Sequence, residues 1–215
     1  NDAHRLIEEA MLAANVCAAD FIATHKHSSL YRVHEGPTPE KRAALQAYLR
    51  ALGLGLSVSD DPHPREFQSL AQATKGRPDA AQIHTMLLRS MQQAIYPGTN
   101  SGHFGLAYPA YTHFTSPIRR YPDLLVHRVI KAMLAEKRYL LDAHKMTAAK
   151  VEKRPGRPAP PDPAKARNEA ERWEVVGAHC SANERRADEA SRDVEAWLKC
   201  KYMREHLGEE FGGVV

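Results

Sequence analysis

The sequence has 215 residues, enough for one domain with a sizeable core or for a large piece of a bigger protein. Its formal charge of +4, from 30 basic and 26 acidic residues, fits a nucleic-acid binder without requiring one. No apolar run approaches the roughly 20 residues of a membrane helix, and the acidic start is unlike a signal peptide, so we expect a cytoplasmic protein without a membrane segment.

The N-terminal segment, residues 1–23, is predicted to be a helix. Its apolar side chains recur at helical spacing, and Asn1 or Asp2 can cap its start. Residues 25–37 then indicate a short extended or irregular piece that closes on a Gly-Pro turn.

Three more helices are predicted in the next 60 residues. The first lies between Thr38, its cap, and Gly53, its stop. The other two cover 65–76 and 78–95, and the second is rich in apolar side chains, so we expect it to be well buried.

The second half of the chain is predicted to contain short strands and two helices. Residues 103–114 favour short strands or extended chain, and a helix then runs to about Lys137. Residues 152–165, dense in proline and charge, are expected to be a surface insertion. A last helix, 164–206, has a heptad-like stripe expected to pack lengthwise on its neighbours, formed by Trp173, Val176, Cys180, Asn183, Ala187, Ala190, Val194 and Trp197. The expected fold class is mainly α with a few short strands (α+β).

The segment HFTSPIRRYPDLLVHR, residues 113–128, is the part of the chain that most clearly suggests a binding site. A Ser-Pro pair at Ser116 is predicted to start a helix whose first turns Pro122 loosens. Arg119 and Arg120 then lie beside unpaired helix amides, where basic side chains oppose the helix dipole. A bound anion would reverse that effect, so the pattern predicts a phosphate site.

A purely structural interpretation of this segment remains open. In it, Arg119 pairs with Asp123 one turn further on and Arg120 is solvated. His127 lies on the same stripe, and we favour a buried histidine with satisfied hydrogen bonds over a catalytic group. The two prolines and the flanking aromatic residues favour the phosphate site over the structural interpretation.

The chain itself provides no obvious metal ligands. Metal-assisted hydrolysis of a phosphodiester needs clustered carboxylates, and the adjacent aspartates Asp60 and Asp61 lie in a loop before a helix, where capping is the simpler interpretation. A zinc site built on His179, Cys180 and Cys200 would match no common spacing. These two cysteines and Cys17 are expected to be buried, reduced thiols.

Several segments closely resemble the RNase R / RNase II family of exoribonucleases, and most of all its bacterial RNase R branch. The longest is GHFGLAYPAYTHFTSPIRRYPDLLVHR. It is flanked, in the order found in the family, by NDAHRLIEEAMLAAN, LYRVHEGPTPEK, MLLRSMQQAIY and ERRADEASRDVEAWLKC. The resemblance covers nearly the whole chain apart from the Pro-rich insertion. It implies a processive, monomeric hydrolase that uses magnesium to degrade single-stranded RNA from its 3′ end to nucleoside 5′-monophosphates.

The resemblance also implies how the chain is divided into domains. Residues 1–208 correspond to the C-terminal half of an RNB-type catalytic domain, with the surface insertion at 152–165. Residues 209–215 correspond to the start of a truncated oligonucleotide-binding barrel. The family's metal-binding aspartates would precede Asn1, so we expect this piece to be inactive alone.

The resemblance assigns roles to individual residues. Arg119 matches the arginine of the Ser-Pro-Ile-Arg motif, which contacts the phosphate near the scissile bond and is needed for turnover. Glu8 matches the first glutamate of the Ile-Glu-Glu motif, which approaches a ribose hydroxyl and helps prefer RNA over DNA. Ser116 and Arg120 are expected to accompany them in binding RNA. A family acid in the last helix falls near Ser191, so its role is not carried over.

Two other functions are compatible with the residues alone. One is a non-catalytic helical module that binds single-stranded RNA through the Arg119–Arg120 region. The other is a helical scaffold that uses the 173–197 stripe for a partner, which leaves residues 116–123 unexplained.

Overall fold

The computed structural model describes residues 2–141 and 168–212, and these are mainly helical. In chain order the α-helices are α1 (Asp2–Thr24), α2 (Pro39–Ala51), α3 (Pro64–Ala73), α4 (Ala80–Ser90), α5 (Tyr121–Leu134) and α6 (Glu169–Met203). Two 3-10 turns are η1 (Phe104–Leu106) and η4 (Arg204–His206). The Pro-rich segment 152–165 lies outside the described residues. The prediction of a mainly helical chain is therefore confirmed.

The expectation of short strands was wrong for the described residues, where extended segments meet only through isolated bridges. Val33 and Ile95 exchange two backbone hydrogen bonds, of 3.0 and 2.9 Å, and their pairing extends no further as a ladder. Residues 103–108 form η1 and a bridge from His103 to Tyr108 instead of a strand. Gly102 at positive φ and Pro109 flank this piece and interrupt a regular ladder.

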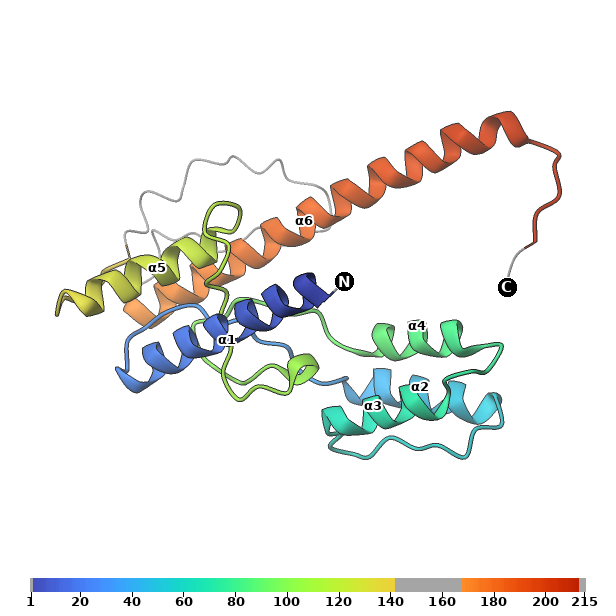
Figure 1. The fold of residues 1–215 in the computed structure, drawn as a ribbon, viewed down its shortest axis with the longest axis horizontal. Coiled ribbons are helices and arrows are strands. Elements are labelled where there is room, and N and C mark those ends of the chain that lie inside the picture. Colours follow the sequence, from blue (N-terminus) through green and yellow to red (C-terminus); the bar gives the residue numbers. More distant parts are fainter. Residues whose placement is uncertain (1, 142–167, 213–215) are drawn as a thin grey trace.

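The main core lies where α1, α5 and the first part of α6 come together (Figure 1). Its fully buried apolar residues include Ile22, Leu125 and Trp173. Gly177 lets α6 approach the extended chain closely, because a Cβ at this position would overlap the carbonyl oxygen of Tyr96. This close contact fixes α6 against the segment that leads into the 113–128 region.

A second core joins α2, α3 and α4 into a separate three-helix group (Figure 1). Its buried members are Leu45, Leu49, Phe67, Leu70, Ile83 and Leu87. Phe104 of η1 packs edge-on against Phe67, with ring centroids 5.6 Å apart, and so connects this group to the rest of the chain.

Local capping follows the sequence at α2 but not at α3. The Thr38 side chain accepts a hydrogen bond from the Lys41 amide, as expected. At α3 the cap is His63, which forms a capping box with Glu66. The expected capping role of Asp60 and Asp61 was therefore wrong, since the prolines around His63 place the helix start after them.

The apolar stripe of α6 is buried only in its first half. Trp173, Val176 and Cys180 are buried, whereas Val194 is 57% and Trp197 is 60% exposed. The second half of α6 extends away from the other described elements (Figure 1). The expectation that the whole stripe packs lengthwise was thus wrong for the described residues.

The cysteines differ in their surroundings. Cys180 is buried, and this burial raises the pKa of its thiol to about 12. Cys17 and Cys200 are exposed, so the expectation of three buried thiols was wrong for two of them. Both lie on helix faces that no described element covers.

None of the helices in the described ranges combines the length and the apolar character needed to cross a bilayer. After η4, residues 209–212 have no regular structure, and 213–215 lie outside the described residues. The expected start of a barrel at 209–215 therefore stays a prediction.

Candidate nucleic-acid interface

The Ser-Pro-Ile-Arg-Arg segment forms a turn, and α5 begins only after it. The amides of Arg119 and Arg120 both donate to the carbonyl oxygen of Ser116, at 3.2 and 3.1 Å. Helix α5 starts at Tyr121, without a side-chain cap, and Pro122 occupies its first turn. The predicted helix start and cap at Ser116 were therefore wrong, because a proline is most stable in the first turn, where its missing amide leaves nothing unpaired.

The turn is folded back onto α5 by Asp123, whose side chain is 0% exposed. Its Oδ1 accepts from the Ser116 amide at 2.7 Å and from Nη2 of Arg120 at 2.9 Å. Because the helix starts at Tyr121, Arg120 rather than Arg119 forms the ion pair, which corrects the structural interpretation of the sequence. Arg119 is exposed, and Ile118 beside it is 98% exposed, so the turn is open to solvent.

Two atoms of this ion pair have spare hydrogen-bonding capacity. Nε of Arg120 and Oδ2 of Asp123 are buried and have no hydrogen-bond partner among the described residues. Buried polar atoms of charged groups are normally paired, so this end of α5 is suited to accept a further polar group.

His127 has a structural role in this region. Its Nε2 donates to the carbonyl oxygen of Phe114 at 2.8 Å. The two rings also stack, with centroids 4.1 Å apart and planes inclined by 10°. The expected satisfied hydrogen bond is confirmed, whereas the expected burial was wrong, because His127 is only half-buried.

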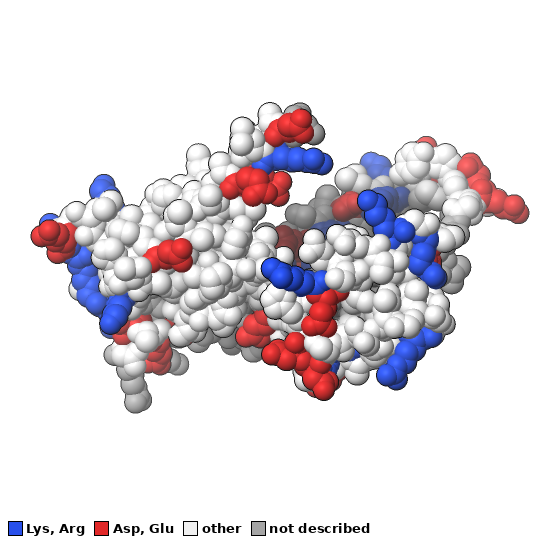
Figure 2. Space-filling model, turned by 60° about the horizontal axis from the view of Figure 1, so that its bottom comes forward, with Lys and Arg blue, Asp and Glu red and all other residues white. Residues whose placement is uncertain are grey.

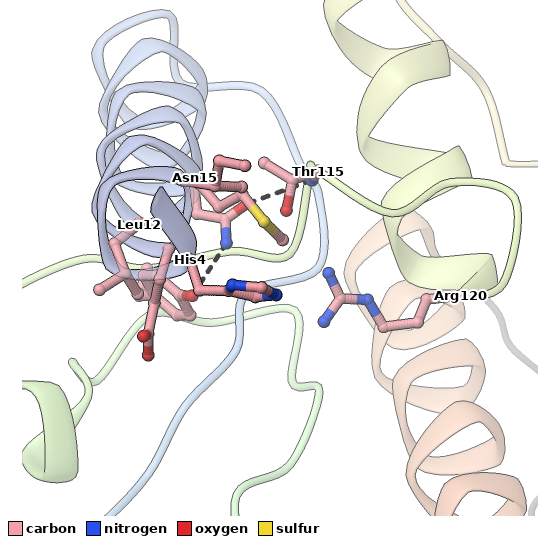
Figure 3. Close-up of a pocket in the computed structure, with 9 residues that line it drawn as sticks. His4, Leu12, Asn15, Thr115 and Arg120 are labelled. Carbon is pink, nitrogen blue, oxygen red and sulfur yellow. Dashed lines mark hydrogen bonds between the residues drawn. The ribbon is translucent and has the colours of Figure 1, made fainter. Parts of the chain in front are cut away.

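Helix α1 is attached to the same loop through Asn15. The Asn15 oxygen accepts from the amides of Phe114 and Thr115, at 2.9 and 3.2 Å. Its Nδ2 donates to the hydroxyl oxygen of Tyr111 at 2.8 Å (Figure 3). No role was predicted for Asn15, although the sequence places it on the same polar face of the helix as His4 and Glu8, which line the cavity described next.

A cavity of about 390 Å³ lies between α1 and this loop (Figure 3). It is lined by His4, Ile7, Glu8, Met11, Leu12, Asn15, Tyr111, Thr115 and Arg120. The guanidinium of Arg120 points towards His4 from the opposite wall (Figure 3). The structure therefore places the predicted residues Glu8 and Arg120 in one cavity.

A second, larger cavity of about 610 Å³ lies between the start of α5 and α6. It is lined by Tyr96, Arg119, Arg120, Tyr121, Pro122, His179, Cys180, Asn183, Glu184, Ala187 and Asp188. Arg119 lines this cavity and Arg120 lines both. Ser116, the fourth predicted residue, lines neither and contributes through its backbone to the shape of the turn.

A partly buried polar network supports the wall of the second cavity, and it was not predicted from the sequence. Arg32 forms an ion pair of 2.6 Å with Glu184 and lies 4.4 Å above the ring of Tyr96. The Tyr96 hydroxyl oxygen is 2.9 Å from Nδ1 of His113 and 3.3 Å from Glu184. Both contacts are satisfied when Nδ1–H of His113 donates to Tyr96 and Tyr96 donates to Glu184.

The network keeps His113 uncharged. Burial, reinforced by the positive charge of Arg120, lowers the pKa of His113 to about 3. Burial also raises the pKa of Tyr96, so its hydroxyl stays protonated. The positive charge near the second cavity therefore comes from arginines, not from histidine.

Charge elsewhere on the surface is mixed. On the face shown in Figure 2, acidic and basic side chains are interspersed with large uncharged areas. Binding of an anion at this site would therefore depend on Arg119 and Arg120 themselves. Within residues 2–141 and 168–212, no group of three or more His, Cys, Asp and Glu side chains could hold a metal ion.

Comparison with known proteins identifies the family. The model of the RNB domain matches residues 1–136. This chain belongs to the RNB-domain family. Ribonuclease R of Vibrio cholerae is 45% identical over 228 aligned residues that cover 100% of this chain and 24% of that protein. The chain thus spans about a quarter of the length of the curated relatives it matches, and the resemblance to RNase R seen in the sequence is confirmed.

Solved structures show the same fold. Mycoplasma genitalium RNase R in complex with ribose methylated single-stranded RNA matches with a TM-score of 0.75 and 24% identity, over 97% of this chain and 30% of that one. Yeast Ssd1, described as a pseudonuclease, matches with a TM-score of 0.55 and 26% identity, over 63% of this chain and 17% of that one. The RNB fold therefore occurs both in proteins named as nucleases and in one named as a pseudonuclease.

Proposed function

We propose that this chain is part of a magnesium-dependent hydrolytic exoribonuclease that degrades RNA from its 3′ end to nucleoside 5′-monophosphates. Membership of the RNB family and relatives named Ribonuclease R support this proposal. The structural observation that most supports the proposal is the position of Arg119, which is exposed on the wall of the α5–α6 cavity beside the N-terminus of α5.

In this proposal Arg119 is the catalytic residue of the chain. Its guanidinium binds the phosphate near the scissile bond and stabilises the negative charge that builds on the phosphoryl oxygens. The dipole and free amides at the start of α5 favour the same anion. Arg120, held by Asp123, adds positive charge from a fixed position between the two cavities.

Glu8 is proposed to contact the sugar of the substrate. A carboxylate can accept a hydrogen bond from a ribose 2′-hydroxyl, which DNA lacks. The apolar side chains of Ile7 and Met11 line the same cavity and offer a surface for the rest of the nucleoside. The cavity on α1 would thus bind the sugar while the arginines bind the phosphate.

The described residues do not fit a magnesium site, because they bring no cluster of potential ligands together. We propose that the metal ligands belong to a portion of the protein outside this sequence, and we assign no step of the reaction to the metal here. The chain alone would then bind RNA without cleaving it. The whole protein is proposed to act as a monomer in the cytoplasm.

A non-catalytic single-stranded RNA-binding module is the alternative function. The similarity to yeast Ssd1 supports this alternative, because Ssd1 shares the fold and is described as a pseudonuclease. Both functions use the Arg119–Arg120 region to bind phosphates, and they differ in whether RNA is cleaved.

Digestion of uniformly labelled single-stranded RNA by the full-length protein distinguishes the two functions. The enzyme hypothesis predicts that magnesium, but not magnesium plus excess EDTA, supports release of nucleoside 5′-monophosphates. RNA labelled at its 5′ end should leave the label on a short residual oligonucleotide and not release it first as a mononucleotide, which establishes the 3′ to 5′ direction. Binding of the RNA without any release of nucleotides would reject the enzyme hypothesis in favour of the module.

A further inference from the structure

The buried side chain of Asn15 is the hydrogen-bonded link between α1 and the arginine-bearing loop. Asn15 is 3% exposed. Its oxygen accepts from the amides of Phe114 and Thr115, which uses both acceptor positions of the group. Apart from the local bonds that residues 25–27 make to the end of α1, the hydrogen bonds that join α1 to another segment in the described part of the chain all come from Asn15.

The loop itself is held to α5 by other side chains. His127 binds the carbonyl oxygen of Phe114, and Asp123 binds the amide of Ser116 and the guanidinium of Arg120. The loop, both arginines and α5 therefore form one unit. Asn15 ties the middle of α1 to that unit, whereas packing of Ala18, Ala19 and Ile22 holds the second half of the helix.

Glu8 depends on this link because its own half of α1 has little packing support. The buried apolar residues of α1 are Ala18, Ala19 and Ile22, all in its second half. Leu6 and Ile7, next to Glu8, are 71% and 61% exposed. Asn15 is thus the buried residue of α1 closest in sequence to Glu8.

Asn15 and Glu8 also share one face of the helix. They are seven residues apart, which is two turns and about 10 Å along the helix axis. Both line the cavity that Arg120 and Thr115 close from the other side (Figure 3). A shift of the Asn15 link would consequently move Glu8 relative to the arginines.

We propose that Asn15 is a positioning residue that sets the distance between the sugar-binding carboxylate of Glu8 and the phosphate-binding arginines, and so determines the preference for ribose over deoxyribose. This inference rests on the proposed function. Misplacing a contacting group by about 1 Å can cost on the order of 100-fold in rate. The contact with a 2′-hydroxyl is sensitive to such a shift, because the carboxylate must meet a single oxygen atom.

The test uses the full-length protein and two strands of one sequence: single-stranded RNA, and the same RNA with 2′-deoxyribose in its last three nucleotides. The readout is the kcat/KM for the RNA strand divided by the kcat/KM for the strand with 2′-deoxyribose. It is measured for wild type, Asn15→Leu and Asn15→Asp. Leucine has the same branched shape as asparagine, although it is larger, and it cannot accept hydrogen bonds from the two amides. Aspartate keeps that acceptor and can also accept from the Tyr111 hydroxyl.

We expect Asn15→Leu to lower the ratio by about 10-fold or more, and Asn15→Asp to keep most of it. A merely structural role would reduce the folded fraction and lower both rates equally, leaving the ratio unchanged. An unchanged ratio in Asn15→Leu, or an equal loss of the ratio in Asn15→Asp, would overturn the inference.

If Asn15→Leu does not fold, Asn15→Ser replaces it under the same criterion, since water can solvate the two amides beside a serine. A wild-type protein without exonuclease activity or without a preference between the strands would reject the proposed function instead.

Discussion

Nη2 of Arg120 donates a hydrogen bond of 2.9 Å to Oδ1 of Asp123, a carboxylate that is entirely shielded from solvent. The same oxygen holds the Ser116 amide, so one buried charge fixes both the turn and the second arginine. Arg119, the adjacent residue, is exposed. Two neighbouring arginines of one motif thus have different physical roles: Arg120 is anchored, and Arg119 is free to meet a ligand.

Replacing Asp123 by alanine should destabilise the fold strongly, because it leaves the guanidinium of Arg120 without its counter-charge. Breaking a buried pair by removing one partner costs about 3–5 kcal/mol. Asp123→Asn keeps an acceptor for the Ser116 amide and should cost clearly less. Urea unfolding of both variants measures the two losses, and a negligible loss in Asp123→Asn, which also lacks the charge, would contradict the assigned role of the buried charge.

Gly177→Ala should be among the most damaging single-methyl additions in the chain. The new Cβ would overlap the carbonyl group of Tyr96. Both the carbonyl and the helix that carries the Cβ are backbone, so neither can move aside as a flexible side chain could. Overpacking of a tight site costs about 1–3 kcal/mol and occasionally more. Gly55→Ala is the matched control, because nothing lies within 4 Å of its added Cβ. A similar melting temperature for the two variants would show that α6 does not pack as closely as described.

Stability should fall in mild acid because two partly buried histidines stay neutral in the folded protein. Burial lowers the pKa of His113 to about 3 and that of His103 to about 4, from an ordinary value of 6.5. Below pH 6.5 the unfolded chain therefore binds more protons than the folded one, so the free energy of unfolding decreases as the pH drops towards 4. The slope is up to about 1.4 kcal/mol per pH unit for each group.

The variant His113→Gln tests the assignment, because glutamine does not titrate. Its free energy of unfolding should depend less steeply on pH between 6.5 and 4 than that of wild type. Urea unfolding at three pH values in this range gives the slopes. Identical slopes would mean that His113 takes up its proton in the folded state as easily as in the unfolded one.

The helices were predictable because their signals are local. Helical spacing of apolar side chains identified α1, and the Thr38 cap with its following proline located the start of α2. The turn at Ser116 was misread for a physical reason as well: two prolines five residues apart each permit a helix start. Packing of Asp123 into the interior selects the second of them.

Long-range contacts could not be predicted from one sequence. The Arg32–Glu184 pair joins residues 152 positions apart, and the Asn15–Thr115 contact joins residues 100 apart. Each partner is an ordinary polar residue in its local sequence. Arg119 and Arg120 were predicted from the local pattern of residues 113–128, and Glu8 from family resemblance, whereas the side chains that hold them in place became visible only in the fold.

Single-turnover release of the first nucleotide by full-length Arg119→Ala tests whether exposed Arg119 stabilises the phosphate during cleavage. We expect a rate loss on the order of 100-fold or more, with an unchanged melting temperature, because the side chain is exposed. Arg172→Ala, at an exposed arginine that lines neither cavity, is the control and should cleave like wild type. A rate for Arg119→Ala within a few-fold of wild type would contradict the account.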